Sequence, residues 1–428
     1  MKIKIYDKDI DYVLAKPRAK HKRPIKPNMF FRTLMRIVAS FDLKKTNFKF
    51  EKIGMERLGK GKNALYLMNH SSFIDLEIVA RMLFPKPFNI VTTSDAFVGK
   101  DYLLRHIGCI PTKKFVSDPT LVRDTIFAAK KLGSNVVMFP EAGYSFDGCA
   151  TTIPETIAKF IKVLGIPLVM ITTYGAFLRD PLYNNIQVRD VDVSAKMEYV
   201  LSAEEINEKS LDEINEIVAK LFSFDNFRWQ EENGVKVDAP FRADYLNRVL
   251  YKCPDCYSEE GMSGRGTVIS CRLCGCKHTL NEYGRLVASD GKPFFDFVSD
   301  WHKWERERVR EEVISGKYSL DVPVEIMMAV DHKRIYRVGE GRLTHSIDGF
   351  RLTDTTGKID YTQKPLSSHS INADFNWYEL GDIICVGNHD ALYYCLPKTE
   401  KDVACKTRLA AEEIYKILSE KKLASESK

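Results

Sequence analysis

ALYLMNHSSFID, residues 64–75, joins an apolar run to a polar turn that holds a histidine and an aspartate. The run over 64–68 predicts a buried strand, and the residues that follow Asp75 predict a helix. Residues five positions apart on a straight helix point about 140° away from each other. His70 and Asp75 can therefore meet only if the histidine lies in the turn and the aspartate in the first helical turn, with Ser72 as the N-cap.

Two interpretations of this turn compete. A carboxylate beside an imidazole fixes its tautomer and stabilises the cation that forms when the ring accepts a proton, which would make His70 a general base oriented by Asp75. The structural alternative is a capping box, because residues 72–75 also read S-x-x-D. The turn alone does not decide between catalysis and capping.

A second polar cluster follows another apolar run. Residues 135–139, NVVMF, predict a strand, and PEAGYS follows at 140–145. Open α/β sheets place their sites at the carboxyl ends of strands. Taken together, NHSSFID and FPEAGYS resemble the first and third motifs, N-H-x4-D and F-P-E-G-T-R-S, of the glycerophospholipid acyltransferase family, which contains the lysophosphatidic acid acyltransferases.

This resemblance implies a catalytic role for His70 and Asp75 and a substrate-binding role for a second set of residues. Residues 108–114, GCIPTKK, occupy the place of the family's second motif, G-x-I-F-I-x-R, which binds the phosphate of the acceptor. The substrate-binding residues implied in this way are Lys113, Lys114, Glu141, Gly143 and Ser145.

The chain departs from the family in two motifs. Lys114 stands where the second motif has arginine, and a lysine supplies a point charge for phosphate but no bidentate fork. In the third motif, Ala142, Gly143 and Tyr144 replace Gly, Thr and Arg. The loss of that arginine removes a phosphate ligand, so the acceptor need not be the family's usual lysophosphatidate.

The expected fold class of the first half of the chain is α/β. Strands and helices alternate between residues 63 and 173, which predicts a sheet covered by helices on both faces. The resemblance implies the mixed sheet of the glycerolipid acyltransferase fold. Beyond the strands already named, we expect strands at 88–92 and 167–171 and helices at 120–132 and 153–164.

Two C-x-x-C knuckles, separated by 14 residues, predict a metal site. This double spacing is typical of a zinc ribbon, and four thiolates close a tetrahedral site with no open position, so the zinc would be structural. Cys276 and His278 lie beyond the second knuckle and are expected to stay outside the ligand set. The expected ligands are Cys253, Cys256, Cys271 and Cys274.

Short strands over 322–397 are followed by an amphipathic helix, an order similar to that of a pleckstrin-homology domain. The acyltransferase fold is thus followed by a zinc ribbon and a small β-rich domain with a C-terminal helix. The expected segments are a basic N-terminal arm at 1–27, an acyltransferase domain with an N-terminal amphipathic helix at 28–240, the ribbon at 245–290, a linker helix at 294–316 and the β-rich domain at 318–428.

The positive charge of the N-terminal residues indicates an anionic partner, either a membrane surface or nucleic acid, and a solvated tail is the structural alternative. Residues 1–60 carry 17 Lys and Arg against 6 Asp and Glu, although the whole chain has a net charge of only +6. Phe30, Phe31, Leu34, Ile37, Val38 and Phe41 fall on one face of a predicted basic helix, which predicts contact with a membrane interface; packing on its own domain is the alternative. The ten cysteines and the absence of a long apolar run favour a cytoplasmic protein, peripheral on the cytoplasmic face of a membrane.

The functional hypothesis is transfer of a fatty acyl group from acyl-CoA or acyl-ACP to the hydroxyl of a lysophospholipid, with 1-acyl-sn-glycerol-3-phosphate as the favoured acceptor, in phosphatidic acid biosynthesis. One alternative is a zinc-ribbon binding protein with an inactive acyltransferase-like domain, which would contact nucleic acid or protein. The intact His70 and Asp75 pair argues against this alternative, and nucleic acid is not the expected partner. Another is a lipid thioesterase or hydrolase that uses water or Ser145.

Overall fold

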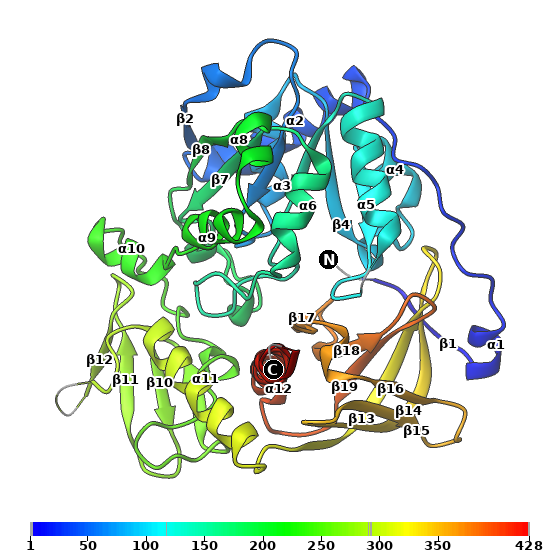
Figure 1. The fold of residues 1–428 in the computed structure, drawn as a ribbon. Helices are drawn as coiled ribbons and strands as arrows, with labels where there is room; N and C mark the ends of the chain where they lie inside the picture. The colour runs from blue at the N-terminus through cyan, green and yellow to red at the C-terminus, as the bar shows by residue number, and fades with distance from the viewer. Residues whose placement is uncertain (1–2, 117, 290, 292, 427–428) are drawn as a thin grey trace.

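The computed structural model describes residues 3–116, 118–289, 291 and 293–426. An α/β unit lies against two smaller β units, and helix α12 (Val403–Glu426) runs between those two (Figure 1). The strand ends of the α/β sheet that carry the two motifs point toward these smaller units.

The α/β unit is built on a mixed sheet of seven strands in the order β2-β8-β7-β3-β6-β4-β5. The strands from β3 to β7 are parallel to their neighbours, whereas β8 is antiparallel to β7 and parallel to β2. The predicted fold class is confirmed. The strands are β2 (Lys49–Ile53), β3 (Leu65–Met68), β4 (Phe88–Thr93), β5 (Cys109–Thr112), β6 (Asn135–Met138), β7 (Leu168–Tyr174) and β8 (Ser194–Leu201).

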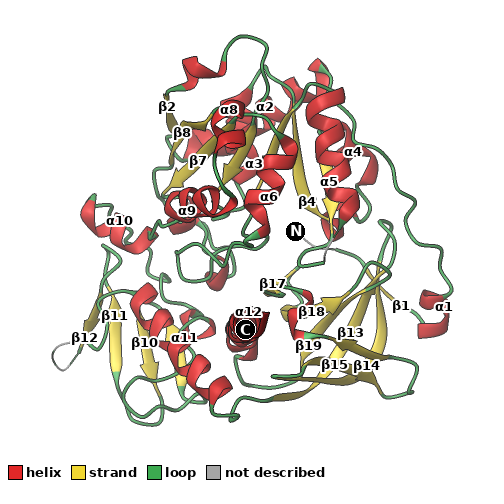
Figure 2. Ribbon diagram, viewed as in Figure 1, coloured by secondary structure: helices red, strands yellow, loops and turns green. Residues whose placement is uncertain are grey.

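Helices cover both faces of this sheet (Figure 2). Alternate side chains of β3 enter different cores, because successive strand residues point to opposite faces: Tyr66 and Met68 pack on the side of α2 (Met29–Lys45) and α3 (Asp75–Leu83), whereas Leu65 and Leu67 pack on the opposite side. The helices of the opposite side are α5 (Pro119–Ile126), α6 (Thr156–Leu164), α8 (Ala203–Glu208) and α9 (Leu211–Leu221), and α4 (Asp101–His106) precedes β5.

The expected zinc ribbon is a four-stranded antiparallel sheet that packs on a long helix. Trp301 of α11 (Val298–Ile314) is fully buried, and its indole Nε1 donates to the Lys252 carbonyl at 2.9 Å, which fixes the helix to the ribbon. Helix α10 (Asn226–Glu232) leads into this unit. The strands are β9 (Met262–Arg265), β10 (Val268–Cys271), β11 (Lys277–Leu280) and β12 (Leu286–Ala288).

The C-terminal unit is an eight-stranded sheet, and one of its strands comes from the N-terminal arm. Its order is β16-β15-β14-β13-β19-β18-β17, and β1 (Ile5–Asp7) pairs in parallel with β14. The remaining strands are β13 (Leu320–Ala329), β14 (Ile335–Ser346), β15 (Gly349–Asp354), β16 (Asp360–Gln363), β17 (Asn372–Trp377), β18 (Gly381–Gly387) and β19 (Leu392–Pro397).

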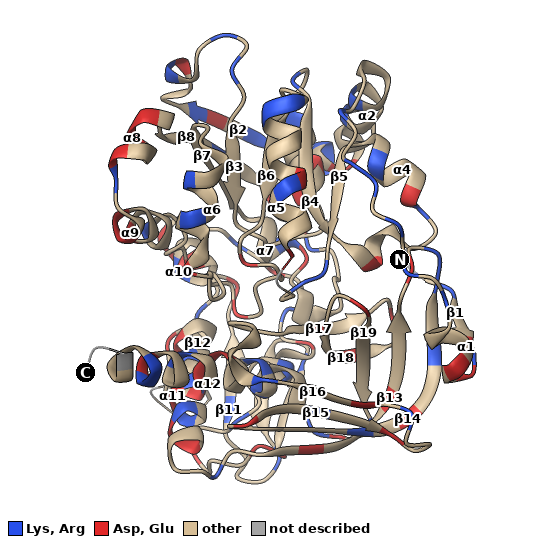
Figure 3. Cartoon of the chain, turned by 45° about the vertical axis from the view of Figure 1, so that its right-hand side comes forward, with Lys and Arg blue, Asp and Glu red and all other residues tan. Residues whose placement is uncertain are grey.

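The basic N-terminal arm contacts both the C-terminal sheet and the α/β unit. After α1 (Ile10–Leu14) it crosses from the C-terminal sheet to the α/β unit. There Lys22 pairs with Asp101 at 2.8 Å, and the Ile25 carbonyl accepts a hydrogen bond from the Asn89 side chain at 2.9 Å. Lys and Arg mark the course of this arm in Figure 3.

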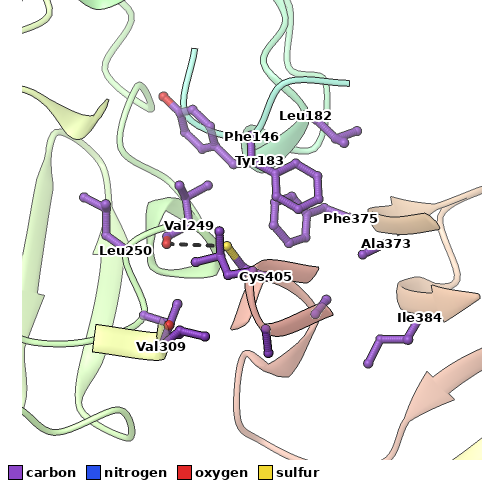
Figure 4. Close-up of a cluster of buried hydrophobic side chains, with 14 of the residues drawn as sticks. Phe146, Leu182, Tyr183, Val249, Leu250, Val309, Ala373, Phe375, Ile384 and Cys405 are labelled. Atoms are coloured by element: carbon purple, nitrogen blue, oxygen red, sulfur yellow. Dashed lines mark hydrogen bonds between the residues drawn. The ribbon is translucent and has the colours of Figure 1, made fainter. Parts of the chain in front are cut away.

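One hydrophobic core joins all three units. Phe146 and Leu182 of the α/β unit, Val249 next to the ribbon and Phe375 of β17 belong to a single buried cluster, which also contains Cys405 of α12 (Figure 4). The loop that carries the third motif is therefore packed against the C-terminal part of the chain. Among the described residues, no helix combines the length and the hydrophobicity that a membrane-spanning segment needs.

Candidate active site

The turn between β3 and α3 brings His70 and Asp75 together. The His70 Nδ1 and the Asp75 Oδ2 lie 2.9 Å apart, as the five-residue spacing predicts when the histidine is in the turn. The same Asp75 oxygen accepts the backbone N–H groups of Ser71 at 3.0 Å and Ser72 at 3.2 Å. The carboxylate thus closes the turn and orients the ring at the same time.

Ser72 is not the N-cap that its position predicts. The helix begins at Asp75 and its N-cap is Ile74. The Ser72 hydroxyl instead donates to the buried carboxylate of Asp180 at 2.5 Å, while accepting the Ile74 N–H at 3.3 Å. The distant aspartate, supplied after β7, competes for the hydroxyl that a local capping motif would use.

The hydrogen bonds assign the tautomer of His70. The Asp75 Oδ2 accepts two backbone N–H groups, so it acts as an acceptor toward Nδ1 as well. Nδ1 therefore carries the ring proton, and the lone pair is on Nε2. Burial lowers the pKa of His70 well below its usual range, and the charge of Lys114 lowers it further. The ring is therefore neutral near pH 7 and able to accept a proton.

Burial also disfavours the charge on the partner. It raises the pKa of Asp75, whereas the N–H groups of Ser72 and Ser71 favour the carboxylate form that accepts the ring proton. A proton gained by His70 would create an imidazolium directly beside this carboxylate, and opposite charges that form together compensate each other in a buried site. The pair is suited to stabilising the ring in its cationic form during a reaction.

Glu141 connects the second loop to the first. Its Oε2 accepts the backbone N–H of His70 at 2.7 Å and its Oε1 accepts that of Thr151 at 2.9 Å. Burial raises the pKa of Glu141 to about 7. The Ser145 N–H donates to the His70 carbonyl at 3.1 Å, which makes a further link. Because both carboxylate oxygens bind backbone groups, Glu141 acts as a positioning residue.

Aromatic rings enclose the imidazole from two sides. The ring centroid of His70 lies 4.2 Å from that of Phe139 and 3.9 Å from that of Tyr144, both in stacked geometry. Tyr144 also stacks on Phe73 at 4.8 Å. The His70 side chain keeps 15% of its surface exposed, so an edge of the ring stays accessible. Tyr144 thus occupies, next to the base, the place where the family motif has arginine.

The other residues with an expected substrate-binding role do not all lie near His70. Lys114 lies close enough to His70 to affect its pKa, whereas Lys113 donates through Nζ to the carbonyl of His389 in the C-terminal unit. The Ser145 hydroxyl donates to the Cys149 carbonyl at 2.5 Å. Gly143 is buried. The structure thus brings Lys114, but not Lys113, to the side of the base.

Several residues of the site escaped the sequence interpretation. The Asn69 Oδ1 accepts the Thr173 N–H at 2.8 Å and anchors the turn to β7, a role that its place in the first motif could have suggested. Arg408 of α12 reaches the third-motif loop, where its Nη1 lies 3.4 Å from the Tyr144 carbonyl oxygen. Phe375 stacks on Phe146 with centroids 4.2 Å apart. No local sequence pattern indicates that Arg408 or Phe375 lies near the site.

Comparison with known proteins identifies the domain that holds this site. Residues 49–172 match the model of the acyltransferase family. The chain carries an acyltransferase domain. Among solved structures, it is similar to the 1-acyl-sn-glycerophosphate (LPA) acyltransferase PlsC from Thermotoga maritima, with 15% identity and a TM-score of 0.37 over 45% of this chain and 76% of that chain. No curated protein matches the chain.

The four cysteines of the two knuckles converge outside the acyltransferase domain. Their sulfur atoms all lie within 4.8 Å of one another, with 3.6 Å between Cys253 and Cys274 and 3.7 Å between Cys256 and Cys271. Tetrahedral zinc with bonds of about 2.3 Å separates its sulfur ligands by about 3.8 Å. Backbone N–H groups also point at the sulfur atoms of Cys253 and Cys271. The set therefore fits a structural zinc ion.

Cys276 lies closer to this cluster than the sequence predicts. Its sulfur is 3.5 Å from that of Cys253, although it is outside the group of four.

We expect the purified protein to contain about one zinc ion per chain, as a closed site of four thiolates requires. Cys274→Ser should lose the metal and lower the unfolding temperature, because metal binding contributes directly to folding. Metal analysis and thermal unfolding would measure both, and Cys276→Ser is the matched control. Loss of zinc in Cys276→Ser alone would contradict the assigned ligands.

The electrostatics of His70 predict a specific pH dependence. Removing the charge of Lys114 should raise the pKa of His70, so that the ring becomes neutral only at higher pH. The acidic limb of kcat/KM should therefore move to higher pH in Lys114→Gln. Lys113→Gln, which removes a neighbouring charge directed at His389, should leave the limb in place. An acidic limb that does not move in Lys114→Gln would show that Lys114 does not act on the base.

Proposed function

We propose that this protein transfers a fatty acyl group from a thioester, on coenzyme A or acyl carrier protein, to the hydroxyl of a lysophospholipid. The observation that carries the proposal is the pair formed by His70 and Asp75, which Glu141 fixes to the third-motif loop. 1-Acyl-sn-glycerol-3-phosphate is the first acceptor to test, and the product would then be phosphatidic acid.

The geometry supports direct transfer with a general base. The His70 Nε2 would remove the proton from the acceptor hydroxyl while the hydroxyl oxygen attacks the thioester carbonyl. Asp75 would balance the charge of the imidazolium that forms, because its Oδ2 lies 2.9 Å from Nδ1. Collapse of the tetrahedral intermediate would break the carbon–sulfur bond, and the departing thiolate would take the proton from His70. The products are the new ester and a free thiol.

Ser145 is poorly placed to act as a nucleophile. Its hydroxyl is directed to the Cys149 carbonyl, and its link to His70 is made through backbone atoms only. A serine hydrolase needs its hydroxyl within hydrogen-bond reach of the base. This contact favours the transferase over the lipase alternative.

An exposed apolar face on α2 supports contact with a membrane. Met35, Ala39 and Leu43 bury the inner face of the helix against the domain. The outer face remains open, with Phe30 exposed by 68% and Phe41 by 70%. Large contiguous apolar patches on soluble proteins mark interaction sites. The other members of this outer face are Met29, Leu34, Ile37 and Val38.

The chemistry of the segment around α2 points to an anionic lipid surface as its partner. The helix ends with Lys44 and Lys45, and the basic arm precedes it. Apolar side chains would enter the interface while Lys and Arg contact lipid phosphates. A peripheral position on the cytoplasmic face would also keep the zinc thiolates in a reducing compartment.

Replacing the base should abolish transfer. His70→Ala should lower kcat by about 10²- to 10⁴-fold, which is the usual contribution of a general base, in an assay that follows thiol release from oleoyl-CoA with lysophosphatidate. The control is His389→Ala, because Asn388-His389-Asp390 offers similar residues on an exposed turn of the C-terminal unit. Retention of most activity in a folded His70→Ala protein would contradict the proposed mechanism.

The membrane contact predicts a separate loss. Replacing both Phe30 and Phe41 by Glu should weaken binding to vesicles that contain phosphatidylglycerol by at least about tenfold, because burying one such side chain contributes about 1.5–3 kcal/mol. Vesicle sedimentation would measure it. Val188→Glu, at a position that is 60% exposed on another segment, is the control. Equal binding of the double variant and the control would exclude α2 as the contact.

A further inference from the structure

A cavity of about 430 Å³ lies where the third-motif loop meets the C-terminal part of the chain. This volume is within the range of small-molecule sites, roughly 300–1,000 Å³. The loop after Tyr144 forms one wall, and α10, α11 and α12 form the others. These walls include Cys149, Ala150, Lys303, Arg306 and Arg408.

Two arginines on the helical walls share a single carboxylate. The Arg306 Nη2 lies 2.7 Å from Glu412 Oε2, and the Arg408 Nε lies 3.2 Å from Glu412 Oε1. Arg306 also contacts Glu413, but that carboxylate is shared with Arg310 and Lys416. More positive than negative charges therefore meet in this network, and Lys303 adds another cation to the wall.

The acidic residues of the cavity have partners of their own. Asp300 pairs with Arg228 at 2.6 Å, and Asp225 lies 3.4 Å from the same arginine while it caps α10. Asp147 accepts the Cys149 N–H at 3.1 Å. Asp225 and Asp300 therefore share one arginine, while Asp147 keeps its charge. The cavity lining holds these three carboxylates against four cationic side chains, which are Arg228, Lys303, Arg306 and Arg408.

The cavity adjoins the catalytic loops. Arg408 is 5% exposed, and its guanidinium lies 4.5 Å from the ring centroid of Phe146 and 3.4 Å from the Tyr144 carbonyl oxygen. A smaller cavity, lined by Asn69, Glu141 and Ser145 among others, shares Cys149 and Ala150 with the larger one. Cys149 and Ala150 therefore lie between the larger cavity and the residues that position His70.

We propose that this cavity binds a phosphate monoester, with Arg408, Arg306 and Lys303 as its ligands. Guanidinium groups match phosphate oxygens with paired hydrogen bonds, which makes arginine the usual residue for such a group. Arg408 of α12 would then supply an arginine, the residue that the family's third motif has at the position of Tyr144. The phosphate belongs either to the donor, as the 3′-phosphate of coenzyme A, or to the acceptor headgroup; this choice rests on the proposed function.

Calorimetric titration of the full-length protein tests the proposal. The probes are coenzyme A with dephospho-coenzyme A as its matched control, and glycerol 3-phosphate with glycerol as its control. The Kd of the phosphorylated member of one pair should rise about tenfold in Arg408→Gln and in Lys303→Gln, as loss of a charge-assisted contact predicts. Lys317→Gln, at an exposed position just after α11, should leave it unchanged.

The two pairs of probes separate the sources of the phosphate. Loss of coenzyme A binding would assign the cavity to the donor, and loss of glycerol 3-phosphate binding would assign it to the acceptor. If Arg408→Gln fails to fold, the exposed Lys303 decides the outcome. The proposal is overturned if neither phosphorylated probe binds better than its control, or if binding is unchanged in the cavity variants.

The same measurements distinguish this inference from the proposed function. Probe binding that depends on the cavity residues in a protein without transferase activity would leave the phosphate site standing and remove the enzymatic proposal. Transferase activity together with probe binding that is indifferent to Arg408 and Lys303 would do the reverse.

Discussion

The site depends on the hydrogen bond between His70 and Asp75, and that bond depends on the shape of a short turn. Asp75 holds the turn by accepting the N–H groups of Ser71 and Ser72 as well as the ring proton. From outside the turn, Glu141 accepts the His70 N–H. Leaving one such buried group without a partner costs about 1–3 kcal/mol. The position of the His70 ring is therefore fixed by a network in which Asp75 and Glu141 each accept two backbone N–H groups.

Segments from outside the acyltransferase domain pack against the loops that form its site. Phe375 and Arg408, from the C-terminal units, lie against the loop that carries Glu141 and Tyr144. A single hydrophobic core continues from that loop into the ribbon and the C-terminal sheet. The N-terminal arm closes the arrangement by adding β1 to the far sheet. The parts that surround the acyltransferase domain thus contribute to the shape of its site, and they supply the charges of the adjoining cavity.

Much of the fold and the metal site could be predicted because the decisive signals are local. Apolar runs located the central strands within a few residues, and the spacing of the cysteines identified a cluster that the structure assembles. The five-residue separation of His70 and Asp75 correctly required a turn. The role of Ser72 was predicted wrongly because its hydroxyl donates to Asp180, which lies beyond β7 in the sequence.

Other features could not be predicted because they arise only when distant segments meet. Arg408 lies far along the chain from Tyr144, and the pairing of β1 with β14 joins residues 5–7 to residues 335–337. Glu141, which the resemblance places among the substrate-binding residues, also holds the turn at His70, because its two oxygens accept backbone N–H groups. Hydrogen-bond partners of a side chain depend on tertiary contacts, so a motif can locate a residue without defining its role.

The central claim is that His70 is held as a neutral base with its proton on Nδ1. Nitrogen NMR of the histidine side chains, with His70 assigned from its loss in the His70→Gln protein, reports this directly. Near pH 7 the account predicts a neutral ring protonated on Nδ1 in the wild-type protein, and a change of tautomer population in Asp75→Asn. A His70 ring that is cationic at that pH, or that carries its proton on Nε2, would contradict it.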